Sequence, residues 1–291
     1  TSQGQDLEMA YMHLPARDGK PTVLLLHGKN FTAAYWAPTA RWLGERGYGV
    51  VMPDQIGFGK SSKPADYQYS FAQLARNTAD LLDALHVGNV IVLGHSMGGM
   101  LATRFALDYR ERTAKLILLN PIGLEDYLLY TRYPSIDAIE ASELKKTPAD
   151  VIAYQKKSYY DGKWTPEYEK LTEPLRGWQL GPDKAVIAKT AALTADMIMT
   201  QPVVNQFKNL RVPTALIIGT RDRSAPNAQN MRESVDYELG RYDRLGKAAA
   251  ATINGAALYE LDGLGHLPQV EDFARFAEVL AEALGERQAP E

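Results

Sequence analysis

The sequence predicts an α/β protein with a mostly parallel, twisted sheet and helices on both of its faces. Short apolar runs alternate with helical patterns along the first 121 residues, and the alternation returns after residue 210. Between these two parts, residues 122–209 contain no convincing buried strand. We therefore expect a core formed by residues 1–121 and 210–291, with residues 122–209 inserted as a helical cap.

The first part of the core begins with an edge strand or hairpin at residues 7–14, which mix apolar and polar side chains. Continuous apolar runs then predict four buried strands, at residues 23–26, 49–52, 90–93 and 115–119. The helices that connect them are expected at residues 33–46, 70–86 and from residue 97 onward. Ser70 and Gln73 form a capping-box pattern that marks the start of the second helix.

The segment 122–209 carries helix-start signals and many tyrosines and tryptophans. Thr147-Pro148 and Thr165-Pro166 each resemble an N-cap followed by proline at the first helical position. Pro182 is expected to begin a third helix that reaches about Thr200. Two interpretations of the aromatic residues stay open: a lid that lines a pocket for a fairly large apolar or aromatic group, or packing of the cap helices onto the core.

The second part of the core supplies the remaining strands and helices. Strands are expected at residues 214–218 and 257–261, an extra helix near residues 241–244, and a final helix at residues 271–284. The first of these strands runs into Gly219-Thr-Arg-Asp222, and the second leads to His266. The connection between them, residues 223–255, is polar and long, and the sequence suggests no chemical role for it.

The composition limits the partners and the chemistry. The chain has 291 residues, of which 45% are hydrophobic and 23% charged, as in an ordinary soluble globular protein. A net charge of −3 gives no reason to expect a nucleic acid or an anionic membrane as partner, and no apolar run is long enough to span a bilayer. The lack of cysteine excludes disulfides, thiolate metal sites and cysteine nucleophiles. A cysteine-free chain that begins at Thr1 fits an exported bacterial protein and a cytoplasmic one, and we favour export slightly.

Residues 90–100 form the most informative stretch. Their pattern predicts a buried strand that breaks into a helix across Gly94-His-Ser96-Met-Gly98. A Gly-x-Ser-x-Gly motif in this context is typical of a nucleophile elbow, a strained turn that presents the serine hydroxyl. Side chains at Gly94 and Gly98 would collide with the neighbouring strand and helix. The amide of Met97, at the helix N-terminus, would face negative charge that develops near Ser96.

Ser96, Asp222 and His266 each follow a predicted parallel strand. The carboxyl ends of such strands meet at one edge of the sheet, where open α/β proteins build their sites. A serine hydroxyl is a poor nucleophile at neutral pH, so it needs a histidine to accept its proton and a carboxylate to orient that histidine. Glu125 or Asp126, after the strand that follows the elbow helix, remain alternatives for the carboxylate.

Four other histidines compete with His266 for the role of base. His95 is next to the serine in sequence, but we expect its side chain to point away from that of Ser96. His86 closes a helix, where a cation is favourable, and His13 is expected at the surface. His266 is therefore the favoured base.

The sequence resembles the α/β-hydrolase superfamily over residues 7–284. The motifs that carry the resemblance are His27-Gly28, Pro53-Asp54 with Gly57-Phe-Gly59-Lys-Ser61, Gly94-His-Ser96-Met-Gly98, Gly219-Thr-Arg-Asp222 and Gly265-His266. They are similar to those of the capped branch, which holds carboxylesterases, epoxide hydrolases, haloperoxidases and meta-cleavage-product hydrolases. The resemblance implies the α/β-hydrolase fold, with the cap inserted before the strand that bears the acid.

The resemblance also implies a role for each residue of the site. Ser96 would be the nucleophile, His266 the base and Asp222 the acid that orients it. The residue after the elbow serine and the residue after His-Gly usually donate the oxyanion-hole amides, and here these are Met97 and Lys29.

Three further side chains near these motifs have more ordinary interpretations. His27 would brace the oxyanion loop, and Asp54 would tie down its glycine-rich loop. The ammonium of Lys29 would either steer an anionic or carbonyl-rich substrate or be solvated, with only its amide mattering. We favour the solvated interpretation, because lone surface lysines rarely carry function.

A serine at the elbow, rather than an aspartate, disfavours alkyl-enzyme chemistry and predicts acyl transfer. The expected activity is that of a carboxylesterase on small to medium esters, with no metal or organic cofactor and a small ester-like molecule as partner. Alternatives with the same triad are a C–C bond (meta-cleavage product) hydrolase, a lactonase or amidase, and a cofactor-free haloperoxidase. A remote alternative is a non-catalytic ligand-binding protein that keeps the fold.

Overall fold

A single seven-stranded sheet organises the protein, of which the computed structural model describes residues 1–286. Its strands lie in the order β1-β3-β2-β4-β5-β6-β7, and all neighbours are parallel except β1 and β3. The strands are β1 (Tyr11–Leu14), β2 (Thr22–Leu26), β3 (Gly49–Pro53), β4 (Val90–His95), β5 (Thr113–Leu119), β6 (Thr214–Gly219) and β7 (Ala257–Leu261). The predicted mostly parallel sheet is confirmed, and the expected edge strand is β1.

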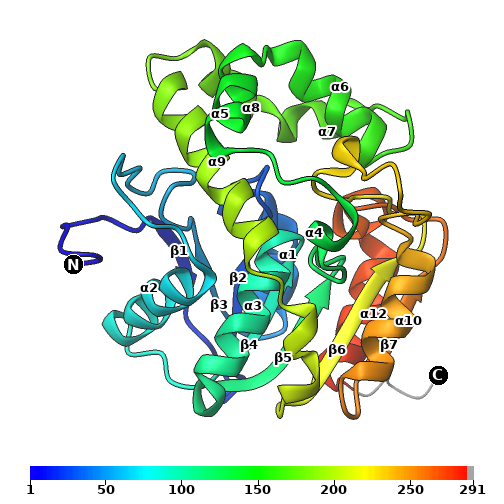
Figure 1. The fold of residues 1–291 in the computed structure, drawn as a ribbon. Coiled ribbons are helices and arrows are strands. Elements are labelled where there is room, and N and C mark those ends of the chain that lie inside the picture. Colours follow the sequence, from blue (N-terminus) through cyan, green and yellow to red (C-terminus); the bar gives the residue numbers. More distant parts are fainter. Residues whose placement is uncertain (287–291) are drawn as a thin grey trace.

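Helices cover both faces of the sheet, as predicted (Figure 1). Side chains alternate between the faces of a strand, so Leu24 and Leu26 of β2 pack in one apolar core and Val23 and Leu25 in the other. The first core includes α2 (Phe71–Ala84), α3 (Met97–Asp108) and α10 (Tyr242–Thr252), and the second includes α1 (Ala37–Glu45) and α12 (Phe273–Leu284).

Six helices follow β5 and precede β6, and the described chain forms no strand between them. They are α4 (Tyr127–Tyr130), α5 (Ile136–Lys145), α6 (Pro148–Ser158), α7 (Pro166–Leu171), α8 (Glu173–Leu180) and α9 (Lys184–Thr200). Helices α5 to α9 lie together above the sheet in Figure 1. Thr147 and Thr165 cap α6 and α7, as predicted, and α9 begins two residues after Pro182.

Two predicted helices differ in detail from those observed. The extra helix expected near residues 241–244 is α10, and it is much longer because its buried face packs on β6 and β7. The predicted final helix is α12, which begins two residues later than expected because Asp272 leaves the helical conformation and its side chain accepts the N–H of Arg275. A short helix that was not predicted, α11 (Pro268–Glu271), precedes it. Short 3₁₀ helices complete the chain at Ala33–Trp36, Arg110–Arg112, Val204–Asn209 and Ala228–Asn230.

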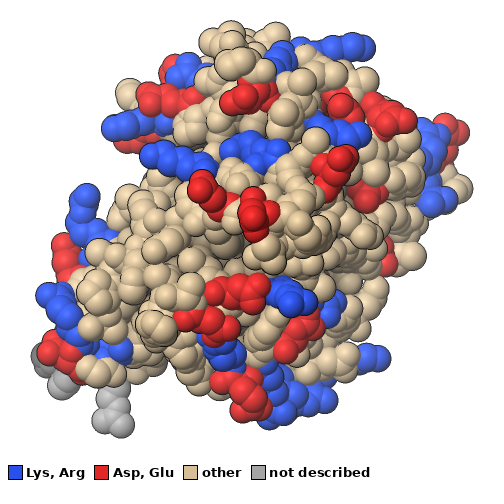
Figure 2. Space-filling view, turned by 90° about the vertical axis from the view of Figure 1, so that its left-hand side faces the viewer, with Lys and Arg blue, Asp and Glu red and all other residues tan. Residues whose placement is uncertain are grey.

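The molecular surface carries both signs of charge. Lysine and arginine side chains are interspersed with aspartate and glutamate on the face shown in Figure 2. None of the helices in residues 1–286 combines the length and the apolarity needed to cross a bilayer.

Candidate active site

Ser96 lies at the junction of β4 and α3 in a strained backbone conformation, with φ of 57° and ψ of −123°. Residues other than glycine rarely adopt a positive φ, so the surrounding contacts must hold this turn. A Cβ atom on Gly94 would lie 2.1 Å from the carbonyl oxygen of Gly98, and one on Gly98 would lie 2.2 Å from that of Leu26. Glycine at both positions therefore allows the close approach of β4, α3 and β2 from which the elbow is built.

Asp222 and His266 come together at the ends of β6 and β7. The Nδ1 atom of His266 lies 2.7 Å from Oδ2 of Asp222, and both side chains are buried. Asn120 donates from Nδ2 to the same oxygen at 2.8 Å, and the N–H of Ser224 donates to Oδ1 at 2.7 Å. Burial acts to raise the pKa of Asp222, but His266 and these hydrogen bonds outweigh it and lower the pKa. The carboxylate therefore stays ionised and accepts a hydrogen bond from the Nδ1–H group, which leaves Nε2 as the unprotonated nitrogen of the neutral ring.

The two alternative carboxylates have other partners. Oε2 of Glu125 accepts the N–H of Gly240 at 3.0 Å, in the loop before α10. Oδ2 of Asp126 accepts a hydrogen bond from Asn205 at 3.4 Å. Asp222 is thus the carboxylate that contacts the ring of His266.

The ring of His95 connects Tyr35, in the 3₁₀ helix Ala33–Trp36, to the loop that carries His266. Its Nδ1 lies 2.9 Å from the hydroxyl of Tyr35, and its Nε2 lies 2.8 Å from the backbone carbonyl of His266. Burial lowers the pKa of His95 well below its usual value, so the ring is neutral and bonds with one nitrogen as donor and the other as acceptor. His13 lies on the exposed strand β1, and His86 follows α2.

The loop after β2 packs directly against the elbow. A Cβ atom on Gly28 would lie 3.1 Å from Cβ of Ser96, so the backbone of Lys29 is brought close to the serine. Met97 is the first residue of α3, and its N–H therefore lacks a carbonyl partner within the helix. The backbones of Lys29 and Met97, which belong to different elements, thus both approach Ser96.

His27 and Asp54 hold the loops beside this site. The ring of His27 accepts the N–H of Gln55 at Nε2 (3.0 Å) and donates from Nδ1 to the following carbonyl (2.9 Å). Burial lowers the pKa of His27, which keeps the ring neutral for this arrangement. The carboxylate of Asp54 accepts the N–H groups of Ala33 and Lys60 at 2.6 and 2.9 Å. The side chains of His27 and Asp54 thus both hydrogen-bond to the backbone of these loops and hold it in place.

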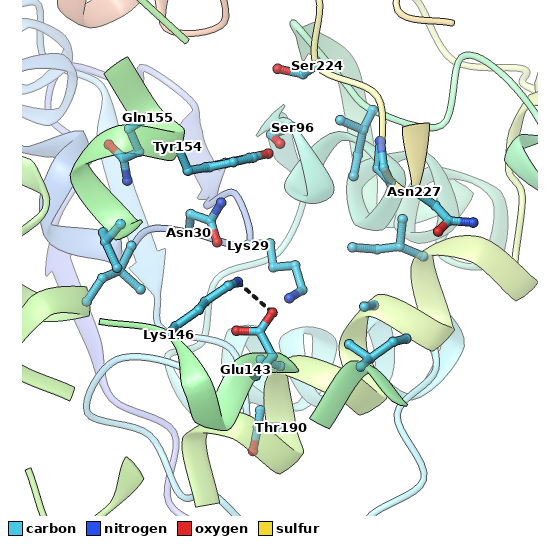
Figure 3. Close-up of a pocket in the computed structure, with 18 of the residues that line it drawn as sticks. Lys29, Asn30, Ser96, Glu143, Lys146, Tyr154, Gln155, Thr190, Ser224 and Asn227 are labelled. Atoms are coloured by element: carbon cyan, nitrogen blue, oxygen red, sulfur yellow. Dashed lines mark hydrogen bonds and ion pairs between the residues drawn. The ribbon is translucent and has the colours of Figure 1, made fainter. Parts of the chain in front are cut away.

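A pocket of about 330 Å³ is bordered by Ser96 and His266 on the core side and by α5, α6, α8 and α9 on the other (Figure 3). Its apolar lining includes Phe58, Ile122, Ile139, Ile187, Ile198 and Met199. Its polar lining includes Lys29, Asn30, Glu143, Lys146, Gln155 and Gln179. The hydroxyl of Tyr154 points toward Ser96 in Figure 3. Among residues 1–286, no group of three His, Cys, Asp or Glu side chains is placed to hold a metal ion.

The side chain of Lys29 differs from the solvated surface lysine that we favoured. It is half-buried and faces the pocket, because the helical segment lies over the loop that carries it. Burial lowers its pKa to about 8, although the nearby carboxylate of Glu143 acts in the opposite direction. Its ammonium is therefore part of the pocket.

Sequence reasoning missed two residues that contact the Asp222–His266 pair. Asn120 binds Asp222, and its position directly after a buried strand was a signal that could have found it. Tyr159, at the C-terminal end of α6, stacks on the ring of His266 with centroids 4.6 Å apart. The aromatic richness of residues 122–209 indicated such residues but not which of them would reach the histidine.

The fold and the site geometry together define the class of protein. Residues 21–273 match the family of the alpha/beta hydrolase fold, and the chain belongs to this family. Its class is thus that of the α/β-fold hydrolases, with the substrate left open.

Three relatives illustrate the similarity. The solved structure of a probable hydrolytic enzyme from Pseudomonas aeruginosa PAO1 is 45% identical, with a TM-score of 0.94, and the match covers 98% of this chain and 92% of that one. An uncharacterized protein of Mycobacterium tuberculosis is 29% identical over 271 residues, which are 89% of this chain and 74% of the relative. A 2-hydroxy-6-oxo-6-phenylhexa-2,4-dienoate hydrolase of Burkholderia cepacia is 37% identical over 116 residues, only 39% of this chain and 41% of the relative.

Proposed function

We propose that the protein is a serine carboxylesterase that cleaves small to medium esters through Ser96, His266 and Asp222. The observation that carries the proposal is the buried contact of 2.7 Å between His266 and Asp222, beside a strained elbow serine on the wall of the same pocket. Residues 122–209 would act as the cap, closing over a core formed by residues 1–121 and 210–291.

In the proposed reaction, the hydroxyl of Ser96 attacks the ester carbonyl while Nε2 of His266 accepts its proton. The amides of Lys29 and Met97 would stabilise the oxyanion, and removal of one such donor typically costs about 3 kcal/mol. His266 then protonates the departing alcohol, and an acyl-enzyme remains. Water activated by His266 releases the acid. Asp222 would hold the ring and stabilise its charged form throughout.

Hydrolysis of a chain-length series of p-nitrophenyl esters tests the proposal. The wild-type protein is compared with Ser96→Ala and with Ser234→Ala, which removes a hydroxyl from an exposed position. We expect turnover by the wild type and by Ser234→Ala, and a loss of at least about 10⁴-fold in kcat for Ser96→Ala. Unchanged turnover in Ser96→Ala would exclude this serine as the nucleophile, and a wild-type protein that cleaves no ester would refute the esterase proposal.

C–C bond hydrolysis is the second candidate, because the local match to the Burkholderia cepacia hydrolase is 37% identical. Lactone or amide cleavage and peroxide-dependent halide oxidation would use the same triad. Ring-fission products, lactones, amides and halide with peroxide are therefore assayed with the same three proteins. Activity on one of these and none on esters would replace the proposed substrate class while keeping the proposed nucleophile.

A further inference from the structure

We propose that the pocket binds a carboxylate group of the substrate, with the ammonium of Lys29 as its main partner, so that the protein prefers anionic esters. This inference deepens the proposed function and rests on it. It starts from the one cationic side chain that the loop beside Ser96 sends into the pocket.

The nearest carboxylate to Lys29 in the pocket, that of Glu143, forms its ion pair with another lysine. In Figure 3 the side chains of Lys29, Glu143 and Lys146 converge on one part of the pocket. The carboxylate of Glu143 forms its ion pair with Lys146, with Nζ and Oε1 2.7 Å apart. Within residues 1–286, this leaves the ammonium of Lys29 with no carboxylate in ion-pair contact.

The cluster therefore has a surplus of positive charge inside a half-enclosed space. Although burial acts to raise the pKa of Glu143, Lys29 and Lys146 outweigh it and lower the pKa, so this carboxylate is ionised. The three side chains carry two positive charges and one negative charge. Asp150 also borders the pocket, but it is exposed, and its carboxylate accepts hydrogen bonds from the N–H and the hydroxyl of Thr147. The face shown in Figure 2 is, by contrast, mixed in sign.

A second observation comes from Gln155 on α6. Its side chain is 1% exposed and borders the same pocket, yet neither atom of its amide group has a hydrogen-bond partner in the described part of the chain. A buried amide without partners is costly, so such groups usually mark a place where a ligand or water binds. In Figure 3 the amide of Gln155 lies apart from the ammonium of Lys29, so its NH₂ group can donate to a second polar atom of the same substrate.

These observations favour a monoanion over a more highly charged group. The surplus of the cluster is one positive charge, which one carboxylate balances and a doubly charged phosphate would exceed. Gly28 packs against Ser96 and the next residue is Lys29, so one small substrate can present its ester to the serine and its carboxylate to the ammonium. The apolar lining would then accept the chain that joins the two groups.

Two matched ester pairs test the preference, because the carboxylate can lie on either side of the scissile bond. Mono-p-nitrophenyl glutarate is compared with its methyl ester, and 4-acetoxybenzoate with methyl 4-acetoxybenzoate. We expect the acid of at least one pair to have a kcat/KM at least tenfold above that of its neutral partner. A preference for the neutral member of both pairs would overturn the proposal.

Variants then assign the preference to Lys29. Lys29→Met should reduce the ratio of anionic to neutral kcat/KM at least tenfold, Gln155→Leu should reduce it less, and Lys29→Arg should keep it above one. Lys170→Met, which removes an exposed lysine of α7, is the control for loss of surface charge. An equal loss on both members of a pair in Lys29→Met would show that the side chain only supports the loop, and would contradict the proposal.

Binding separates a failure of this inference from a failure of the esterase proposal. Monomethyl glutarate and benzoate, both monoanions, are titrated calorimetrically into Ser96→Ala with and without Lys29→Met. Binding that requires Lys29, together with a wild-type protein that cleaves no ester, would support the anion site and refute the esterase. Hydrolysis of neutral esters, with no carboxylate binding and no preference for acids, would support the esterase and refute the anion site.

Discussion

The ring of Tyr159 stacks on the ring of His266, with centroids 4.6 Å apart and planes inclined by 26°. The two residues come from different parts of the chain, since Tyr159 ends α6 in the helical segment and His266 follows β7 in the core. The hydroxyl of Tyr159 accepts a hydrogen bond from Asn30 at 2.8 Å, which fixes the tyrosine from the other side. The helical segment thus contributes directly to the orientation of the proposed base.

Replacing the aromatic ring should impair turnover more than removing the hydroxyl. An aromatic pair contributes about 0.5–1.5 kcal/mol beyond its buried area, so Tyr159→Leu is expected to lower kcat by about 3- to 10-fold. Tyr159→Phe keeps the stack and loses only the bond from Asn30, so its kcat should lie closer to the wild-type value. Steady-state kinetics on one p-nitrophenyl ester measure both, and equal losses in the two variants would show that the stack does not orient His266.

Asn120 should act as a positioning residue for the acid. Its Oδ1 accepts the N–H of Gly219 at 2.8 Å while its Nδ2 binds Asp222. Asn120→Ala leaves both groups short of a partner in a buried place, so the free energy of unfolding should fall by about 1–3 kcal/mol. Urea unfolding measures this loss.

Asn120→Asp distinguishes positioning from simple packing. It replaces a donor with a second carboxylate beside Asp222, and like charges raise the pKa of such a pair. Asp222 then ionises at a higher pH than in the wild type, where Asn120 helps to hold its pKa low. The acid limb of the kcat/KM profile should therefore move to higher pH in Asn120→Asp, and an unmoved limb would refute this role.

The glycines of the elbow should be intolerant of a single methyl group. Gly94→Ala would place its Cβ 2.1 Å from a backbone oxygen of α3. The helix backbone cannot move far enough to relieve this clash. We expect a loss of stability of about 3 kcal/mol or more, or failure to fold. Gly177→Ala, in α8, is the matched control, since no other atom of residues 1–286 outside its own helix backbone and chain neighbours lies within 4 Å of its Cβ position. It should stabilise the protein by about 0.5–1 kcal/mol, because alanine favours the helix.

The strand ends were predictable from the sequence because buried parallel strands are continuous apolar runs. Val90–Leu93 and Ala215–Ile218 mark β4 and β6 in this way, so the strands before Ser96 and Asp222 could be found without a structure. The contact between Tyr159 and His266 could not be predicted, since it depends on how the helical segment lies over the sheet. Periodicity shows which face of a helix is apolar but not which neighbour covers it.

The start of the last helix shows a second limit. The sequence predicted a helix from Glu271 to Leu284, whereas α12 begins at Phe273 and the short helix α11 before it was not predicted. Asp272 instead caps α12, with φ of −149° and ψ of 85°. The preceding residue, Glu271, accepts the N–H of Gly265 at 2.7 Å and pairs with Arg221. The break between α11 and α12 therefore places the carboxylate of Glu271 under the loop that carries His266. This is a tertiary contact, so the spacing of apolar residues along the helix cannot predict it.

The charge of Lys29 should cost the protein stability at neutral pH. Burial lowers its pKa to about 8 in the folded protein, whereas an unfolded chain holds a lysine near its usual value of about 10.4. The folded state therefore binds this proton less tightly, so the cost is complete below pH 8 and declines as the pH rises toward 10.4. Because the side chain is partly exposed, we expect Lys29→Met to raise the free energy of unfolding at pH 7 by only about 1–2 kcal/mol.

Urea unfolding at pH 7 and pH 10 should show this gain in the free energy of unfolding shrinking at the higher pH, with Lys170→Met unchanged at both. A gain of equal size at both values would attribute the effect to packing of the methionine, whereas a shrinking gain shows that the protein gives up stability to keep a cation in its pocket.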